Sequence, residues 1–536
     1  MQLSDSVLPQ LESPNLGITS RLRDYNYPAS EATHISQLLS AAKQERVELE
    51  SCLLILENRR RNIAWHISRC ESLLSPVRKV TNEILVKIFR LCCRIEIGPG
   101  KRVVIPALNV RSVCKGWQAA VDSTEDLWSW ITLHIDAYDV DDDEYGSDEY
   151  SERQARILSI ILQRSGNTGL TIELRSSSNA TSSNESASDY DFTAFEKLQK
   201  QSDRWISLTA SLQPCLQSRV LTPLRGSVSQ LQIVELHLFD YGNLCELSDG
   251  LEIAPSLYSF KLTTEVWEPE ISLPWTQITH IGCFWRGQWW NSNGADFLST
   301  VISFSCAICV PDDDEDGDDR EVAMSAPVLE DLQLCVWPGY TMDNEKSVFS
   351  FPLLAAPKLR ALTLYKDKMH EINELNPDSK SAYIDLEEMN ILDLLRSGYA
   401  LTSLSITDVH VMPEQLVVLL KELPLLVFLQ IKEPNDSNNS AIITTQLAMS
   451  MNPSIDPYSN IFLPSLQKID FDLYHRDNVQ THAALMEMII ARWRPSHICC
   501  LKCVELSVPE FDQPHLRTVQ RLYDQGMAIA VVIRSG

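Results

Sequence analysis

The chain has 536 residues, 44% of them hydrophobic, which is enough for several domains with a sizeable buried core. Its 46 lysines and arginines are outnumbered by 72 acidic residues, and the net charge of -26 argues against a nucleic-acid-binding protein and favours a basic partner or none. No run approaches the ~18 uncharged apolar residues that a membrane span needs, so we expect no contact with a membrane.

The N-terminal residues predict an intracellular protein. The opening MQLSDSVLPQLESPN has no basic segment followed by an apolar one, so it does not indicate secretion. The 14 cysteines do not resemble the framework of a small disulfide-bonded domain, and we expect them to be reduced. These features favour a location in the cytoplasm, the nucleus or both. Residues 1–33 are rich in Ser, Pro and Asn without periodicity, which predicts a disordered lead.

Residues 34–76 are predicted to form a long amphipathic helix that ends near Ser75-Pro76. Two rows of residues recur at intervals of seven, the first wholly apolar and the second alternating with arginine. The rows are Ile35, Ala42, Leu49, Leu56, Ile63 and Cys70, and Leu39, Arg46, Leu53, Arg60, Ile67 and Leu74. A coiled-coil seam would have both rows apolar. The arginines therefore favour packing against the next domain over self-association.

Residues 77–135 are predicted to form a small all-α module of three helices. Thr81 or Asn82 is a suitable N-cap, and Glu83 lies in the first turn, where the helix dipole favours an acid. Behind it the segment E-I-L-x-x-I-F places Ile84, Leu85, Ile88 and Phe89 on one apolar stripe. A second segment ends in V-C-K-x-W, and a Leu-Trp pair closes the region.

This order of motifs resembles an F-box, and the helix before it resembles the layout of the F-box-like proteins of mushroom-forming fungi. Thr81-Asn82 stands where that family usually has a proline before the glutamate. The resemblance covers residues 77–135 and implies that this module binds a Skp-family adaptor. The implied adaptor-binding residues are Val80, Ile84, Leu85, Ile88, Phe89, Leu108, Val113, Cys114, Trp117, Leu127 and Trp128.

Residues 136–200 are predicted to be a linker that holds the first α/β elements. An acidic run covers 139–149, and the apolar segments 157–162 and 169–174 predict a helix and a strand. A Ser/Asn-rich stretch from Ser176 to Ser188 is typical of a solvated loop.

Residues 201–536 are predicted to form an irregular leucine-rich-repeat-like solenoid, an α/β fold with parallel strands. The pattern L-x-x-L-x-L, with other apolar residues allowed, begins at Leu231, Leu257, Ile278, Val301, Leu329, Leu359, Leu401, Leu426, Leu466 and Leu501. Several of the intervals lie in the range of leucine-rich repeats. Such a strand cannot bury its leucines alone, and stacking gives neighbouring strands a shared core. The alternative is an ordinary α/β domain whose strands are rich in leucine.

The sequence predicts no enzyme, metal site or cofactor. It lacks the glycine-rich, G-x-S-x-G and H-E-x-x-H motifs of common active sites. Asp312 opens a D-x-D-x-D-G segment like that of a calcium loop, but Ala323 stands where the bidentate glutamate is required. The densest aromatic cluster predicts a target-binding loop, because Trp and Arg dominate binding hot spots, or else a packed corner of the core. Its residues are Trp285, Arg286, Trp289 and Trp290.

The order of these regions, read with the resemblance, implies a non-catalytic substrate receptor of a Skp–cullin–F-box ubiquitin ligase. The F-box-like module would bind the adaptor, and through it a cullin, while the repeats would hold a protein target of unknown identity. Such a receptor acts by proximity, because it raises the effective concentration of the target's lysines. The alternative is a repeat-based interaction scaffold in which the F-box-like part is only a structural cap, since solenoids need caps with a polar outer face.

Overall fold

The structure is a computed structural model, and it divides the chain into two compact units, Met1–Leu85 and Val86–Gly536. The division falls inside one helix, α3 (Asn82–Cys92). The residues that the structure describes are 32–98, 103–135, 147–176, 190–238, 249–264, 272–284, 298–308, 324–336, 354–366, 383–384, 386, 391, 394, 400–435, 441–453, 462–474, 479–493, 501–509 and 511–534.

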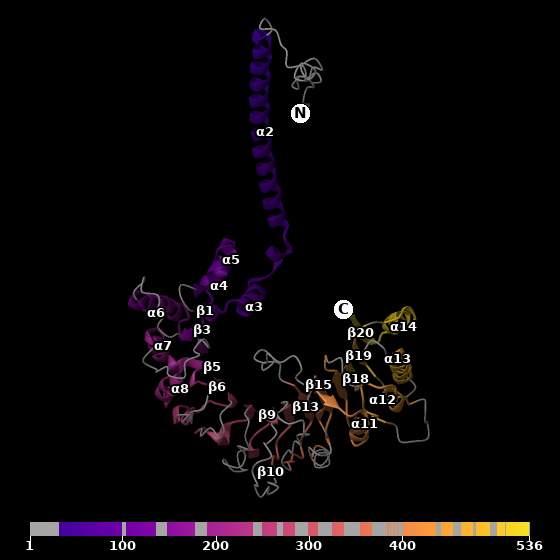
Figure 1. Cartoon of the computed structure of the whole chain (residues 1–536). Helices are drawn as coiled ribbons and strands as arrows, with labels where there is room; N and C mark the ends of the chain where they lie inside the picture. Colours follow the sequence, from indigo (N-terminus) through magenta and orange to yellow (C-terminus); the bar gives the residue numbers. More distant parts are fainter. Residues whose placement is uncertain are drawn as a thin grey trace. The chain divides into compact units, whose positions relative to one another are not determined.

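The first unit consists mainly of one unbroken helix, α2 (Ala32–Leu74), of 43 residues (Figure 1). The predicted long helix is therefore confirmed. Ser75-Pro76 ends it, because proline removes a backbone donor and clashes with the preceding turn. The short 3-10 helix η2 (Pro76–Lys79) follows. Arg78 closes the last turn of α2, since its Nε donates to the carbonyl oxygen of Ser72 at 2.7 Å.

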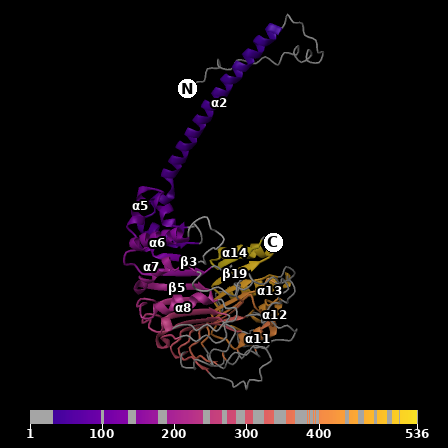
Figure 2. The same cartoon turned by 60° about the vertical axis from the view of Figure 1, so that its left-hand side comes forward.

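The second unit is built on a sixteen-stranded sheet whose strands are parallel except for β2. Its strands follow an arc, with the helices on the outer side and the strands on the inner side (Figures 1 and 2). In order across the sheet they are β2 (Val103–Val104), β1 (Ile95–Ile97), β3 (Trp130–Ile135), β4 (Leu170–Ser176), β5 (Trp205–Leu212), β6 (Ile233–Leu238), β7 (Ser259–Thr264), β8 (His280–Phe284), β9 (Ser303–Ile308), β11 (Asp331–Val336), β13 (Ala361–Tyr365), β15 (Ser403–Thr407), β17 (Phe428–Lys432), β18 (Lys468–Asp472), β19 (Cys503–Val508) and β20 (Ala528–Ile533).

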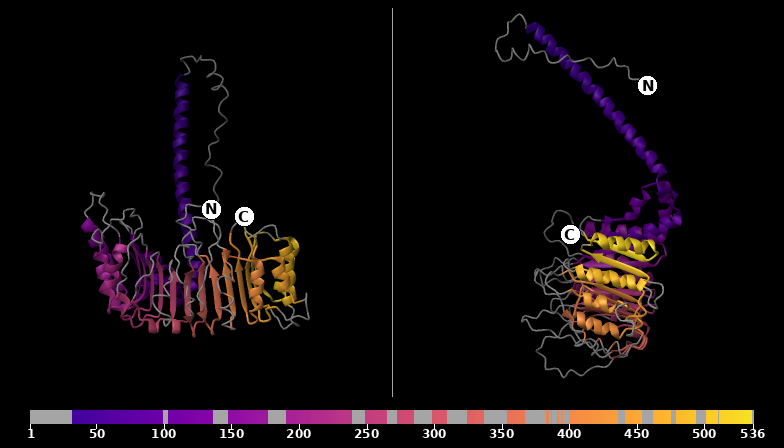
Figure 3. Two further views of the ribbon diagram at one scale, coloured as in Figure 1. Left: turned by 60° about the horizontal axis from the view of Figure 1, so that its bottom comes forward. Right: turned by 90° about the vertical axis from the view of Figure 1, so that its right-hand side faces the viewer.

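Short helices connect strands at both ends of this sheet (Figure 3). Before β6 they are α4 (Pro106–Arg111), α5 (Lys115–Asp122), η3 (Glu125–Trp128), α6 (Ser147–Arg164), α7 (Thr193–Gln199), η5 (Ser202–Arg204), α8 (Pro214–Leu221) and η6 (Thr222–Leu224). After β15 they are α11 (Pro413–Lys421), α12 (Thr445–Ser450), α13 (Val479–Trp493) and α14 (Gln513–Asp524). Between lie the 3-10 turns η7 (Asp249–Leu251) and η8 (Trp275–Gln277), and two small parallel pairs, β10 (Met324–Ser325) with β12 (Leu354–Ala355) and β14 (Tyr383–Ile384) with β16 (His410–Val411).

Each of the ten L-x-x-L-x-L segments contributes one strand to the sheet, and each strand begins two residues after the first residue of its segment. Leu359 and Ala361 illustrate the offset, which recurs at every segment from Leu231 to Leu501. The first, fourth and sixth residues of all ten segments are buried. They form three apolar rows that neighbouring strands share, which is why no strand has to bury its leucines alone. The sheet is therefore solenoid-like and mostly parallel, as predicted.

Residues 77–135 differ from the prediction of an all-α module, because they also supply β1, β2 and β3. Ile95 and Ile97 are buried on either side of the half-buried Glu96, and β3 buries Ile131, Leu133 and Ile135. This alternation with a period of two is a strand pattern. The alternating runs have only three and six residues, so the pattern is hard to recognise in a sequence region that also forms helices. The region therefore begins the sheet as well as forming helices.

No helix within the described residues has the combined length and apolar character that crossing a bilayer requires.

Removing a large side chain from a core row should destabilise the second unit strongly. Phe304 of β9 is 1% exposed and lies in register between Ile281 of β8 and Leu332 of β11. We expect Phe304→Ala to lower the free energy of unfolding by about 3–5 kcal/mol, because it leaves a cavity between strands that hold their neighbours. Urea unfolding followed by circular dichroism measures this. The control is Ile302→Ala, at a side chain that is 40% exposed, and losses of similar size in the two variants would contradict the shared core.

Candidate protein-binding surfaces

Helices α3, α4 and α5 are held together by a few specific contacts. The ring of Phe89 meets that of Trp117 edge to face, with centroids 4.9 Å apart. Arg111 of α4 grips the carboxylate of Asp122 at the end of α5 with two hydrogen bonds of 2.8 and 3.1 Å. That guanidinium lowers the pKa of Asp122 below its ordinary value. The buried Trp128 lies under the guanidinium of Arg164, which is 4.4 Å from its ring centroid. These contacts hold α3 and α4 against α5, and η3 against α6.

The predicted adaptor-binding residues fall into three groups by exposure. Leu85, Phe89, Leu127 and Trp128 are buried. Val80, Cys114 and Trp117 are half-buried. The exposed residues are Ile84, Ile88, Leu108 and Val113. The last group is the most open to a partner, whereas Phe89, Leu127 and Trp128 belong to the core of the second unit.

The most exposed apolar residue that is described in this region was not predicted from the sequence. Leu91 is 86% exposed and lies three residues after Ile88 on α3, so the two share a helix face. Ile84, four residues before Ile88, continues the same stripe. The signal was present in the spacing, but periodicity alone does not say which stripe of a helix is buried. We call Ile88, Leu91, Leu108 and Val113 the module face.

The face of the sheet opposite the helices carries polar rows that run across the strands. Because the parallel strands pair in constant register, residues between the apolar positions align from strand to strand. The row through the middle of the strands holds its charged residues towards its two ends and only neutral residues at its centre: Glu96, Thr132, Glu173, Thr209, Glu235, Lys261, Gly282, Ser305, Gln333, Thr363, Ser405, Gln430, Asp470 and Glu505. Hydrogen bonds link neighbours along it, as from Ser405 Oγ to Gln430 Oε1 at 2.6 Å.

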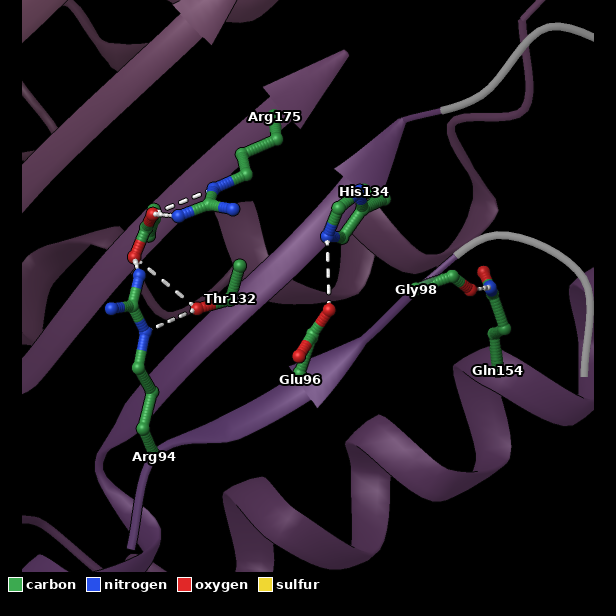
Figure 4. Close-up of polar contacts among 8 residues, drawn as sticks. Arg94, Glu96, Gly98, Thr132, His134, Gln154 and Arg175 are labelled. Carbon is green, nitrogen blue, oxygen red and sulfur yellow. Dashed lines mark hydrogen bonds and ion pairs between the residues drawn. The ribbon is translucent and has the colours of Figure 1, made fainter. Parts of the chain in front are cut away.

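At the N-terminal end of these rows, one carboxylate is shared by two arginines (Figure 4). Glu173 accepts from Arg175 Nε at 2.7 Å and forms an ion pair with Arg94. The buried Thr132 hydroxyl accepts from Arg94 Nε at 3.0 Å and donates to Glu173 Oε2 at 3.3 Å. Burial and the charge of Arg175 lower the pKa of Arg94. This cluster joins β3 and β4 to the residue just before β1.

Further along the same row, Glu235 of β6 is held between a histidine and a lysine. His237 Nε2 lies 3.3 Å and Lys261 Nζ 2.6 Å from Glu235 Oε1. The hydrogen bond from His237, with help from Lys261, lowers the pKa of Glu235 from an ordinary 4.5 to about 2. Because its folded-state pKa is depressed, Glu235 contributes stability that is complete above pH 4.5 and is lost as the pH falls towards 2.

The stability difference between the wild-type protein and Glu235→Gln should therefore narrow on acidification. We expect the wild type to melt at a higher temperature at pH 6, and the gap to shrink by pH 3, because at pH 3 the Glu235 carboxyl binds a proton in the unfolded chain but stays mostly ionised in the folded protein. Differential scanning fluorimetry at both pH values measures the gap. Ile302→Ala carries no charge change and serves as the reference for general acid effects. A gap for Glu235→Gln that is the same at both pH values would contradict this role.

A pocket of about 570 Å³ lies at the carboxyl ends of the strands in the C-terminal part of the sheet. Another polar row lines it, since Thr407, Lys432 and Asp472 are register neighbours at the ends of β15, β17 and β18. The complete lining holds three cationic and three acidic side chains: Tyr365, Lys366, Thr407, Asp408, Lys432, Glu433, Asn435, Asp472, Tyr474 and Arg534. A pocket of this size holds one side chain or a small molecule.

Two acidic residues in this pocket have different roles. Glu433 is 5% exposed and accepts from the backbone amides of Ile443 at 2.9 Å and Tyr474 at 3.0 Å, so it ties two loops together. Asp472 forms an ion pair with Arg534, but its Oδ1 is buried and has no hydrogen-bond partner among the described residues. Burial raises the pKa of Asp472. Leaving a buried carboxylate oxygen without a hydrogen bond costs free energy.

The predicted target-binding residues Trp285, Arg286, Trp289 and Trp290 lie outside the described residues. In the part of the chain that is described, no group of three His, Cys, Asp or Glu side chains is placed to hold a metal ion. The sequence matches no model of a known protein family, and no curated protein matches it.

Proposed function

We propose that this protein is a non-catalytic substrate receptor of a Skp–cullin–F-box ubiquitin ligase. The observation that carries the proposal is the division of the apolar residues of α3 to α5 into a buried and an exposed set. Phe89 and Trp128 are buried, while the module face is left open. Several large apolar side chains left exposed on small neighbouring helices favour a protein interaction site. The F-box-like order of motifs in the same residues supports a Skp-family adaptor as the partner.

We propose that the target binds the polar face of the sheet and reaches the pocket beside Asp472. The pocket offers both donors and acceptors, because Lys432 and Arg534 stand beside Asp472 and Asp408. The acidic side chains in the lining favour a group with an N–H or O–H donor, such as the backbone or a polar side chain of a protein. The net charge of -26 favours a target with a basic surface. Binding there would hold the target close to the ligase.

The second candidate function is a repeat-based scaffold in which residues 77–135 only cap the sheet. The observation in its favour is that β1, β2 and β3 come from this range and form one end of the sheet. A structural cap requires this continuity, whereas adaptor binding requires the exposed module face. The two functions therefore differ in whether Ile88 and Leu91 are needed for binding.

Charging the module face should abolish adaptor binding without unfolding the protein. We expect Ile88→Asp with Leu91→Asp to weaken binding of a purified Skp-family adaptor roughly 100-fold or more, because unpaired carboxylates would be buried in the interface. Isothermal titration calorimetry on the full chain measures this. Phe89 is unsuitable for this test because it is buried.

The matched control is Ile160→Asp with Ile253→Asp, at two side chains that are exposed elsewhere in the second unit. It should bind the adaptor as the wild type does. Wild-type protein that does not bind the adaptor would overturn the proposal and favour the scaffold, and so would double variants that both bind it unchanged.

Reversing a charge in the pocket should abolish binding of the target without affecting binding of the adaptor. We expect Lys432→Glu to lose target proteins in affinity purification with mass spectrometry, because it places a second acid beside Asp472, its register neighbour. Lys502→Glu, at an exposed lysine that does not line the pocket, is the control. An identical set of co-purified proteins from all three chains would contradict the proposed target site.

A further inference from the structure

The apolar rows of α2 are exposed within its own unit. Leu53 and Leu56, near the middle of the helix, are each 60% exposed, and Ile63 and Ile67 are also exposed. At 1.5 Å per residue, a helix of 43 residues is about 65 Å long. Helices in proteins gain most of their stability by packing an apolar face against a partner. An apolar stripe that runs along the whole of α2 therefore indicates a partner of similar length.

The length of the stripe limits what can cover it. Among the described helices the next longest is α6, with 18 residues, which spans less than half of α2. A second α2 has the same length and the same repeat of seven, so it matches the stripe from end to end.

We propose that α2 pairs with α2 of a second copy of this chain in an antiparallel two-stranded coiled coil. In that arrangement a residue of one row faces a residue of the other row in the partner. A single register places all twelve residues of the two rows in facing pairs, because the two residue numbers of each pair add to the same sum. The layers are Leu39 with Cys70, Arg46 with Ile63, Leu53 with Leu56, Arg60 with Leu49, Ile67 with Ala42 and Leu74 with Ile35.

The arginines in the second row select this orientation. In a parallel pair in register, Arg46 would face Arg46 and Arg60 would face Arg60, which places like charges inside the seam. In the antiparallel pair each arginine faces an apolar residue and can lay its aliphatic stem along it, with the guanidinium at the edge. The same register puts Arg60 between Glu57 of its own copy and Glu50 of the second copy. Arg46 has an acid within its own helix, since its Nε lies 3.5 Å from Glu50 Oε1.

This pairing would bring two receptors into one assembly. The pairing involves only residues of the first unit, so a test of it does not depend on the proposed ligase function.

The mass of the full chain in solution tests the pairing. We expect size-exclusion chromatography with light scattering to give a dimer for the wild type and a monomer for Leu53→Asp, with the dimer weakened roughly 100-fold or more, because the short acidic side chain cannot carry its charge out of the seam as arginine can. Leu54→Asp is the control, because Leu54 is exposed beside Leu53 but belongs to neither row, and it should remain a dimer. A monomeric wild type, or a dimer that Leu53→Asp leaves intact, would overturn the proposal.

A mixture of two variants tests the orientation. Leu53→Asp should be monomeric alone and should form a heterodimer when mixed with Leu56→Lys. In the antiparallel pair the new lysine of one copy faces the new aspartate of the other, and the remaining Leu53 and Leu56 still face each other. In a parallel pair position 53 faces position 53, so no such ion pair forms. Failure of the mixture to form a heterodimer would overturn the antiparallel register.

Discussion

Sharing of three apolar rows between neighbouring strands is the constraint on which the second unit depends. A strand that presents leucine at the first, fourth and sixth positions of its segment has a stable place only beside another strand with the same spacing. Leu359, Leu362 and Leu364 show the pattern, and all three are fully buried. Because every segment repeats this spacing, the register stays constant along most of the sheet. The positions between the apolar rows are then forced into alignment as well.

This forced alignment is what gives the polar face its chemistry. Glu235 meets Lys261, and Lys432 comes to stand beside Asp472, although the residues in each pair are far apart in sequence. In each pair, a charged side chain on one strand lies next to a side chain of opposite charge on the neighbouring strand. Asp472 also has one buried oxygen, Oδ1, without a hydrogen-bond partner among the described residues, and this side chain lines the pocket. Elsewhere in that pocket Glu433 is committed to holding loops in place.

The sequence predicts the repeated parts of the fold better than the parts that occur once. The long helix and the ten strands follow from spacing, which is a local property of the chain. The strands β1 and β3 were not expected, because Ile95–Ile97 and Trp130–Ile135 are short alternating runs beside helices. Exposure of Leu91 was missed because periodicity identifies stripes but not which one is covered. The pocket was beyond prediction, since Tyr365 and Arg534 meet only through the stacking of the strands between them.

The constant offset between segment and strand has a consequence for how such a chain can change. The ten segments begin at intervals that range from 21 residues, between Leu257 and Ile278, to 42, between Leu359 and Leu401, yet each strand starts two residues into its segment. The spacing of strands in space is thus independent of the amount of chain between them. Insertions and deletions in these connections are tolerated without shifting the sheet. The connections between strands can therefore change in length and sequence during evolution while the sheet is preserved.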